Sequence, residues 1–264
     1  MDEVPGAGTF AVPGATYDAF MGRYSSQLAP AFAAAAGVRA GQTAVDVGCG
    51  PGALTAHLAD LLGAEAVRAC DPSHPFVEAC AARVPGATVV EGRAEELPFP
   101  TGSADHVLAQ LVLHFVSDAD QAAREMARVA RPGGVVSACM WDAVAGVDML
   151  RAFWDAAHRV DRAVPEDAGR VRFGGPGELV ALLRGAGVQD VAESTVSVSC
   201  SYGSFDELWG GFLAGVGPAG SYCVGLAEGD RARLRDALHA RLGAPAGSFT
   251  LGAVARCAVG RTPG

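Results

Sequence analysis

Apolar residues along the first half of the chain occur in short runs that alternate with longer stretches of helical periodicity. Runs of this kind are typical of buried strands, and they predict strands at 43–47, 66–70, 88–91, 106–109, 135–141, 191–200 and 249–259. The first five runs are apolar on both sides, as strands are when helices cover both faces of a parallel sheet.

Apolar residues spaced by three or four positions predict helices at 53–62, 75–83, 120–130, 149–160, 177–185, 205–215 and 230–242. The sequence Arg131-Pro132-Gly133-Gly134 provides a stop for the third of these helices. Strands and helices that alternate in this way indicate an α/β protein. We therefore predict a Rossmann-like, doubly wound, mostly parallel sheet of seven strands with helical cap elements.

The same pattern divides the chain. Residues 1–16 are rich in Gly, Pro and Ala without periodicity, which predicts a flexible leader before a helix that begins near Tyr17. Residues 17–264 are predicted to form one domain. Within it, residues 17–142 form a ligand-binding core, and residues 143–264 add the late strands and the helices of a substrate cap.

Composition narrows the classes of partner. The 264 residues carry a net charge of −9, and the basic residues are scattered, whereas nucleic acid requires a basic stripe. Every apolar run is interrupted before the roughly 20 residues that span a bilayer. The first residues show no secretory signal, so we expect a cytoplasmic protein. No C-x-x-C pair occurs among the seven cysteines, so free thiols and no metal site are expected.

The segment from Ala44 to Leu54 runs from an apolar strand through a glycine turn into a predicted helix, as a nucleotide cradle does. The glycines also fit a dinucleotide fingerprint that ends at Ala53, so they do not separate the cofactors. Asp46 separates the two kinds of cofactor, because a carboxylate inside an apolar strand is explained better by a ligand with an ammonium group than by a pyrophosphate. The alternative is that Asp46 bonds only the N–H groups of the turn.

A second acid, Asp71, ends the next strand, where a carboxylate can accept both hydroxyls of a ribose. The alternative is an Asx-type helix start with Pro72 and Ser73. Loops at 92–99 and 109–111 follow the third and fourth strands and would meet at the same edge of the sheet.

These residues resemble the class I S-adenosylmethionine-dependent methyltransferases, in the branch of ubiquinone- and secondary-metabolite-type enzymes that act on small molecules. The resemblance is strong over residues 17–142 and loose beyond them. It implies that the D-x-G-x-G-x-G motif at 46–52 wraps the methionine moiety and that the acid at the end of the second strand binds ribose. It also implies adenine contacts at 93–95 and a turn beneath the sulfonium at 110–111.

Many relatives have Asp where this chain has Arg93, so recognition of the adenine amino group is expected from Glu95 or the backbone. The block 17–24 also looks like the amino-terminal helix of many such bacterial enzymes, and this resemblance implies that Tyr17 and Arg23 meet the cofactor carboxylate. The predicted S-adenosylmethionine-binding residues are therefore Tyr17, Arg23, Asp46, Gly48, Cys49, Gly50, Gly52, Asp71, Pro72, Arg93, Ala94, Glu95, Gln110 and Leu111.

Methyl transfer from a sulfonium depends mainly on positioning, which is worth roughly 7–11 kcal/mol, so a base is optional. His114 is the candidate base because it follows the turn at 110–111; the alternative is a packed core histidine. Aromatic residues of the first helix and the cap are the candidate acceptor pocket, although they also suit a core: Phe20, Tyr24, Trp141, Phe153, Trp154, Trp209, Phe212 and Tyr222.

The acceptor is expected to be a small molecule methylated on O, C or N. The turn after the fourth strand lacks the Asn/Asp-Pro-Pro-Tyr sequence found in many enzymes that methylate amino groups of bases, which disfavours such an acceptor but does not choose between O, C and N. A homodimer is compatible with the sequence. Three other functions stay open: a nicotinamide-dependent oxidoreductase, an enzyme that uses the sulfonium cofactor without losing its methyl group, and a binding protein without turnover.

Overall fold

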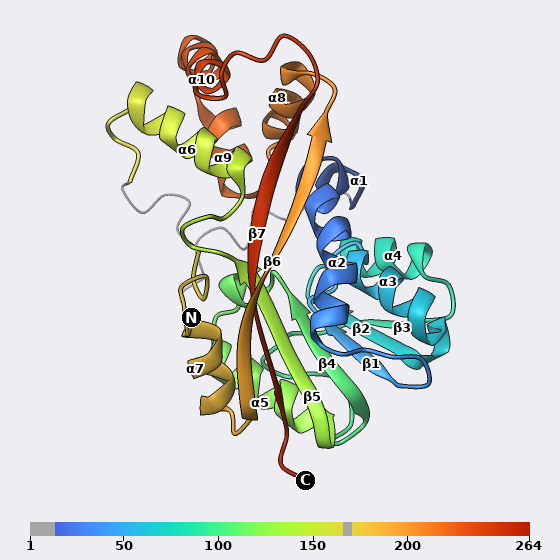
Figure 1. The fold of residues 1–264 in the computed structure, drawn as a ribbon. Coiled ribbons are helices and arrows are strands. Elements are labelled where there is room, and N and C mark those ends of the chain that lie inside the picture. The colour runs from blue at the N-terminus through green and yellow to red at the C-terminus, as the bar shows by residue number, and fades with distance from the viewer. Residues whose placement is uncertain (1–13, 166–170) are drawn as a thin grey trace.

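A computed structural model describes residues 14–165 and 171–264 of the chain (Figure 1). Its seven strands form one sheet in the order β3-β2-β1-β4-β5-β7-β6. The strands are β1 Ala44–Val47, β2 Val67–Asp71, β3 Thr88–Glu91, β4 Ala104–Gln110, β5 Ala130–Trp141, β6 Gln189–Tyr202 and β7 Phe249–Arg261. Strands β1 to β5 run parallel, and β7 runs antiparallel to both β5 and β6. The predicted fold class, a mostly parallel sheet of seven strands, is confirmed.

Helices cover both faces of this sheet because its strands are apolar on both sides (Figure 1). One face packs against α2 Arg23–Ala35, α3 Ala53–Leu62 and α4 His74–Arg83; the other packs against α5 Ala119–Val129 and α7 Glu178–Gly185. Side chains along each strand alternate between these faces. Thus Asp46 of β1 and Gln110 of β4 both point to the side of α2 and α3.

The hairpin of β6 and β7 extends beyond the rest of the sheet. Strand β5 ends at Trp141, opposite Ala255, so β6 is the one strand of the sheet that pairs with residues 249–254 of β7. The loop after β5 adds an isolated bridge from Val147 to Ala253. Cap helices gather around this projecting part (Figure 1): α6 Asp148–Val160, α8 Phe205–Leu213, α9 Gly217–Gly225 and α10 Glu228–Arg241. The cap therefore rests on the hairpin and on α2, and it lies beside the carboxyl ends of the parallel strands.

Three local predictions need correction. Residues 14–16 belong to helix α1, Gly14–Tyr17, which a π-helical turn at Asp18–Gly22 (η2) joins to α2, so the predicted leader is too long; residues 1–13 lie outside the described residues. Helix α9 was not predicted because glycine and proline interrupt its pattern. The predicted stop at 131–134 does end α5, but these residues already belong to β5.

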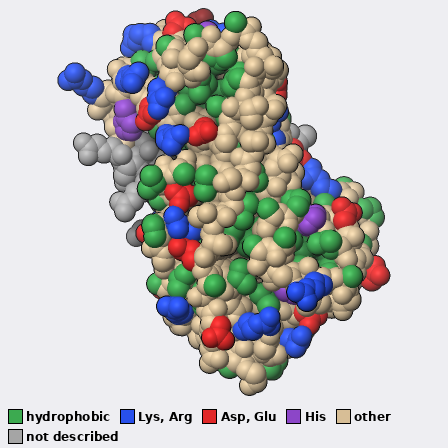
Figure 2. All heavy atoms as spheres, in the orientation of Figure 1, with side chains coloured by type: hydrophobic (Ala, Val, Ile, Leu, Met, Phe, Trp, Pro, Cys, Tyr) green, Lys and Arg blue, Asp and Glu red, His purple; other side chains and the backbone are tan. Residues whose placement is uncertain are grey.

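Among the described residues, no helix is both long enough and apolar enough to cross a membrane. On the face shown in Figure 2, acidic and basic side chains lie near one another at the upper end, along the left edge and at the lower end. The two signs alternate here at short range, so this face carries no basic stripe of the kind that phosphate backbones need.

Candidate functional site

A cavity of about 630 Å³ lies at the carboxyl ends of β1, β2, β3 and β4. This is the edge where open α/β sheets hold their ligands. The cavity wall includes most of the predicted cofactor-binding residues: Tyr17, Asp46, Gly48, Cys49, Gly50, Asp71, Pro72, Arg93, Ala94, Glu95, Gln110 and Leu111. The structure thus brings together residues from four strand ends and from α1.

The glycine turn after β1 is anchored to β2. The N–H groups of Gly48 and Cys49 both donate to the carbonyl oxygen of Cys70, at 2.8 and 3.0 Å. Gly48, Gly50 and Gly52 all have positive φ, which other residues adopt only with strain. Gly52 does not line the cavity, because it precedes α3 and packs against Cys80 of α4. The structure therefore places Gly52 where α3 and α4 pack together and not in the cavity wall.

Asp46 is a buried carboxylate near the end of β1 and faces the first turn of α3. It is 1% exposed, and its Oδ2 accepts a hydrogen bond from Thr55 Oγ1 at 2.6 Å. Burial raises the pKa of Asp46 to about 7, with a smaller contribution from the charge of Asp71 and against the opposing effect of the bonds from Thr55. The alternative that Asp46 bonds the N–H groups of the turn does not match these contacts, since its described partner is Thr55.

Asp71 joins the turn to the next helix. Its Oδ2 accepts from the N–H of Gly50 and its Oδ1 from the N–H of Ser73, both at 2.9 Å. The second bond is the Asx-type helix start, so this alternative describes a real contact. Burial raises the pKa of Asp71 in spite of both bonds. Each oxygen retains a second lone pair, so the same carboxylate can also face a ligand in the cavity.

Gln110 and Leu111 form the wall below α2. The Nε2 of Gln110 donates to the carbonyl oxygen of Ser25 at 3.1 Å, while its Oε1 is buried with no partner among the described residues. Leu111 has φ 63°, a strained conformation for a residue with a branched side chain, and its N–H donates to Cys139. Strain and an unsatisfied polar atom at one turn mark a functional position.

The segment after β3 contributes Arg93 and Glu95, whose side chains already contact other residues of the protein. Arg93 lies 3.6 Å from Glu95, and the Oε1 of Glu95 accepts the N–H of Ser117 at 3.2 Å. The predicted adenine-side acid is thereby held against the loop that follows β4, and both loops line the cavity.

Several residues of the cavity wall were not predicted from the sequence. Two of them, Phe76 and Ser25, contact the predicted residue Tyr17: the ring of Phe76 lies edge-on at 5.7 Å between centroids, and Ser25 Oγ lies 3.4 Å from the Tyr17 hydroxyl. The signal available was position, since most of the missed residues lie within a few positions of a strand end. They are Ser25, Pro51, Ala53, Leu54, Ser73, Pro75, Phe76, Gly92, Val112, Phe115, Val116 and Ser117.

Arg23 lies outside the cavity wall and contacts the cap instead. Its guanidinium lies 3.0 Å from Glu207, donates to the carbonyl oxygen of Ser201 and stacks 4.2 Å from the ring centroid of Tyr202. The structure does not bring Arg23 beside the wall residue Tyr17: the π-helical turn η2 separates them, and Arg23 points to β6 and α8.

We expect Arg23→Ala to loosen the cap without affecting the cavity. Loss of a partly buried cation–π contact and a charge-assisted bond should lower the free energy of unfolding by about 1–2 kcal/mol. Thermal denaturation measures this, and titration with S-adenosylhomocysteine should give the wild-type affinity. A large loss of affinity with unchanged stability would return Arg23 to the cavity.

His114 is also placed outside the wall. Its Nδ1 accepts the backbone N–H of Arg172 at 2.7 Å, and its ring packs edge-on against Phe115. Burial and the charge of Arg172 lower the pKa of His114. The short 3-10 turn at Leu113–Phe115 (η4) turns Phe115 and Val116 to the cavity and His114 to the neighbouring loop. The structure thus favours the packed histidine over the base.

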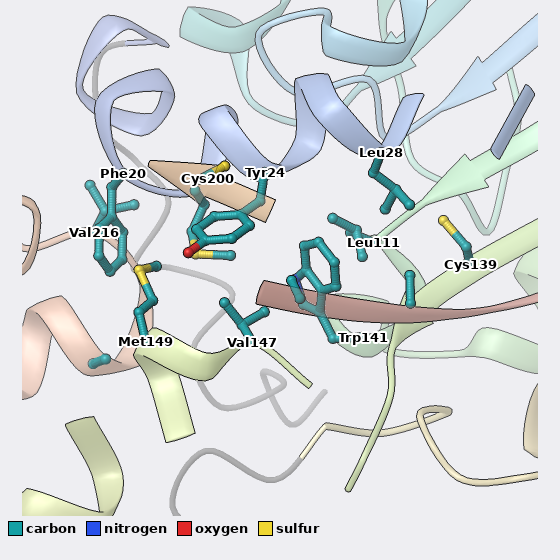
Figure 3. Packing of buried hydrophobic residues seen from close by; sticks show 14 of the residues in the cluster. Phe20, Tyr24, Leu28, Leu111, Cys139, Trp141, Val147, Met149, Cys200 and Val216 are labelled. Atoms are coloured by element: carbon teal, nitrogen blue, oxygen red, sulfur yellow. The ribbon is translucent and has the colours of Figure 1, made fainter. Parts of the chain in front are cut away.

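Most of the aromatic residues predicted to form the acceptor pocket are buried in a hydrophobic cluster, and the others pack against it. Phe153 stacks on Phe212 with 4.4 Å between centroids, and Tyr24 meets Trp141 edge-on at 6.3 Å. Figure 3 shows Phe20, Tyr24 and Trp141 among the buried side chains of this cluster. None of the predicted aromatic residues lines the described cavity: Phe20, Tyr24, Trp141, Phe153, Trp154, Trp209, Phe212 and Tyr222. They bind the cap to the sheet.

The sheet order, the glycine turn and the acid after the second strand define a Rossmann-like protein that binds a nucleoside ligand. Residues 45–138 match the family model described as a methyltransferase domain. The chain is similar to the fatty-acid O-methyltransferase of Mycolicibacterium smegmatis, with 35% identity over 43% of this chain and 42% of the relative. It is also similar to the demethylmenaquinone methyltransferase of Beutenbergia cavernae, with 41% identity over 38% of this chain and 41% of the relative.

These matches span about two fifths of each curated relative's length. The YcgJ protein of Bacillus subtilis has a similar fold, with a TM-score of 0.57 at 17% identity, covering 92% of this chain and 99% of that one. Residues 45–138 thus match a methyltransferase domain, and the whole chain shares the fold of the YcgJ protein.

Proposed function

We propose that this chain binds S-adenosylmethionine in the described cavity and transfers its methyl group to a small molecule. The observation that carries the proposal is the pair of buried carboxylates, Asp46 and Asp71, on either side of a glycine turn at the edge of the sheet. A buried carboxylate with a raised pKa is costly unless a cation or a set of donors meets it. An ammonium group and ribose hydroxyls are such partners.

The charges of the wall separate this cofactor from a dinucleotide. Three carboxylates line the described cavity, at Asp46, Asp71 and Glu95, and the arginine of the wall, Arg93, already faces Glu95. Such a wall favours a cationic ligand and disfavours a pyrophosphate. The residues present therefore fit S-adenosylmethionine better than NAD.

Each wall segment has a proposed part. Asp46 and the turn hold the amino-acid end, Asp71 holds the ribose, and Glu95 with its neighbours holds the adenine. The Oε1 of Gln110 is buried without a partner among the described residues, and the end of the cavity lined by Gln110 and Ser25 is the proposed place of the acceptor. We place the methyl acceptor here, rather than among the aromatic residues of the cap.

Positioning is the main contribution of the protein to this reaction. When bound, S-adenosylmethionine supplies an electrophilic methyl group. The chain holds donor and acceptor in line and keeps water out, which can supply roughly 7–11 kcal/mol of the barrier. No histidine lies in the described wall, so an acceptor nucleophilic without a strong base is favoured. We further propose a cytoplasmic enzyme and leave a homodimer as a hypothesis for sedimentation analysis.

Incubation with S-adenosylmethionine labelled in the methyl group tests the proposed reaction. With a panel of phenols, quinols, amines and fatty acids, we expect label in a product and release of an equal amount of S-adenosylhomocysteine. Conversion of a substrate without that release would indicate a cofactor-assisted step without methyl loss. Affinity without any conversion would indicate a binding protein.

The raised pKa of Asp46 gives a prediction on pH. In the folded chain this pKa is about 7, above the ordinary 3.8, so its contribution to stability is fully present below about pH 3.8 and is lost as the pH rises through about 7. A cationic ligand binds the ionised form, so its affinity changes in the opposite direction. Titration with S-adenosylhomocysteine should show about tenfold weaker binding at pH 6 than at pH 8.

The matched variant is Asp46→Asn, which keeps the shape and removes the charge. Its affinity should be low at both pH values, and the step between them should disappear. If the affinity of the variant changed with pH as that of the wild type does, Asp46 would not face the ligand.

A further inference from the structure

Two cysteines form a pair behind the cofactor turn. Cys49 is the residue between Gly48 and Gly50, and Cys80 lies on α4. The two side chains share one small buried cluster with Ala69. The two thiols are therefore neighbours behind the turn.

The two members of the pair differ in access. All seven cysteines are buried free thiols, and of these Cys49 alone lines the described cavity. Cys49 is 7% exposed, whereas Cys80 is fully buried. A small reagent that enters the cavity therefore reaches the sulfur of Cys49 first and finds Cys80 directly behind it.

We propose that Cys49 and Cys80 are an oxidation site, at which a peroxide forms a disulfide that prevents binding of the adenosyl ligand. The sulfur of Cys49 attacks one peroxide oxygen, the O–O bond breaks, and a sulfenic acid and one water form. The sulfur of Cys80 then displaces the hydroxyl group as a second water. Two thiols are oxidised by two electrons, and the peroxide is reduced by two.

The environment of Cys80 suits the second step. Cys49 lines the cavity and Cys80 is fully buried behind it, so the peroxide meets Cys49 and Cys80 is the resolving cysteine. The neighbouring thiol of Cys49 and the hydroxyl of Thr55 lower the pKa of Cys80. This favours the thiolate, which is the nucleophile in disulfide formation.

The disulfide would disturb the turn because the residues around it are closely packed. A disulfide bond is about 2 Å long, much shorter than the separation of two sulfurs that are not bonded. The space next to Cys80 is already filled, since a Cβ on Gly52 would lie 2.8 Å from its Sγ. Cys49 must then move toward α4, and its N–H bond to Cys70 and the neighbouring cavity wall move with it.

The consequence for ligand binding rests on the proposed cofactor site, so the experiment has two readouts. The reduced full-length chain is treated with hydrogen peroxide, mapped for cross-linked peptides and titrated with S-adenosylhomocysteine. We expect a Cys49–Cys80 cross-link and an affinity at least about tenfold lower, restored by dithiothreitol. Saturation with S-adenosylhomocysteine before the treatment should slow cross-linking, because the ligand covers Cys49.

Two variants control the result. Cys80→Ser should bind S-adenosylhomocysteine like the reduced wild type both before and after peroxide. Cys223→Ser, on α9 of the cap and outside the described cavity wall, should lose affinity after peroxide as the wild type does. Free thiols at both positions after treatment would overturn the oxidation site. A cross-linked chain that binds as tightly as the reduced one would overturn the effect on binding. Failure of the reduced chain to bind contradicts the proposed function, while the peptide map still decides the thiol pair.

Discussion

Asp71→Ala is expected to lower the affinity for S-adenosylhomocysteine by about 10- to 100-fold. Two contributions are lost together: the carboxylate that would accept the ribose hydroxyls, and the bond that holds the N–H of Gly50 at 2.9 Å. Hydrogen bonds to a charged group are worth about 1.5–3 kcal/mol each, and 1.4 kcal/mol is a factor of ten in affinity. Isothermal titration calorimetry measures the change.

The control for Asp71→Ala is Asp60→Ala, which removes an acid of the exposed side of α3 outside the described cavity wall. The control should bind like the wild type, and both variants should keep the far-ultraviolet circular dichroism of the folded chain. Equal affinity of Asp71→Ala and wild type would show that the acid serves only as the helix start with Ser73.

Gly48→Ala is expected to lower the free energy of unfolding by about 2–4 kcal/mol. At φ 68°, a Cβ is strained by about 1 kcal/mol, and it would lie 2.5 and 2.6 Å from the two methyl carbons of Val112. Overpacking of this kind costs typically 1–3 kcal/mol. Denaturant unfolding of both proteins gives the difference.

Gly50→Ala separates strain from collision. Gly50 also has positive φ, at 53°, but nothing lies within 4 Å of the position where its Cβ would be. This variant should lose only about 1 kcal/mol. Val112→Ala in the Gly48→Ala background should recover part of the lost stability. Equal losses in the two glycine variants, or no recovery, would contradict the close packing of the turn against Val112.

The strands and the cofactor turn were predictable because local sequence and fold agree there. Residues 88–91 and 53–62 match their elements without change, and the apolar runs on both sides of the glycine turn place it at the edge of the sheet. The wall residues at the strand ends follow from the same rule, since parallel strands meet their ligand at their carboxyl ends.

The remaining parts depend on tertiary packing that no local pattern contains. An aromatic residue such as Phe212 suits a pocket and a core equally, and here the stacking on Phe153 makes it core. Arg23 and His114 each lie a few residues from the cavity wall, but helix phase and a 3-10 turn direct them to Glu207 and Arg172. Orientation over such short distances is decided by packing partners distant in the sequence.

The central claim is that the cavity binds an adenosyl-sulfur ligand and not a dinucleotide. Calorimetric titration of the purified chain with S-adenosylmethionine, S-adenosylhomocysteine and NAD in parallel tests it most directly. The account predicts micromolar binding of the two adenosyl-sulfur ligands and no heat of binding with NAD. Binding of NAD without either of the other two would contradict the assignment that begins at Asp46.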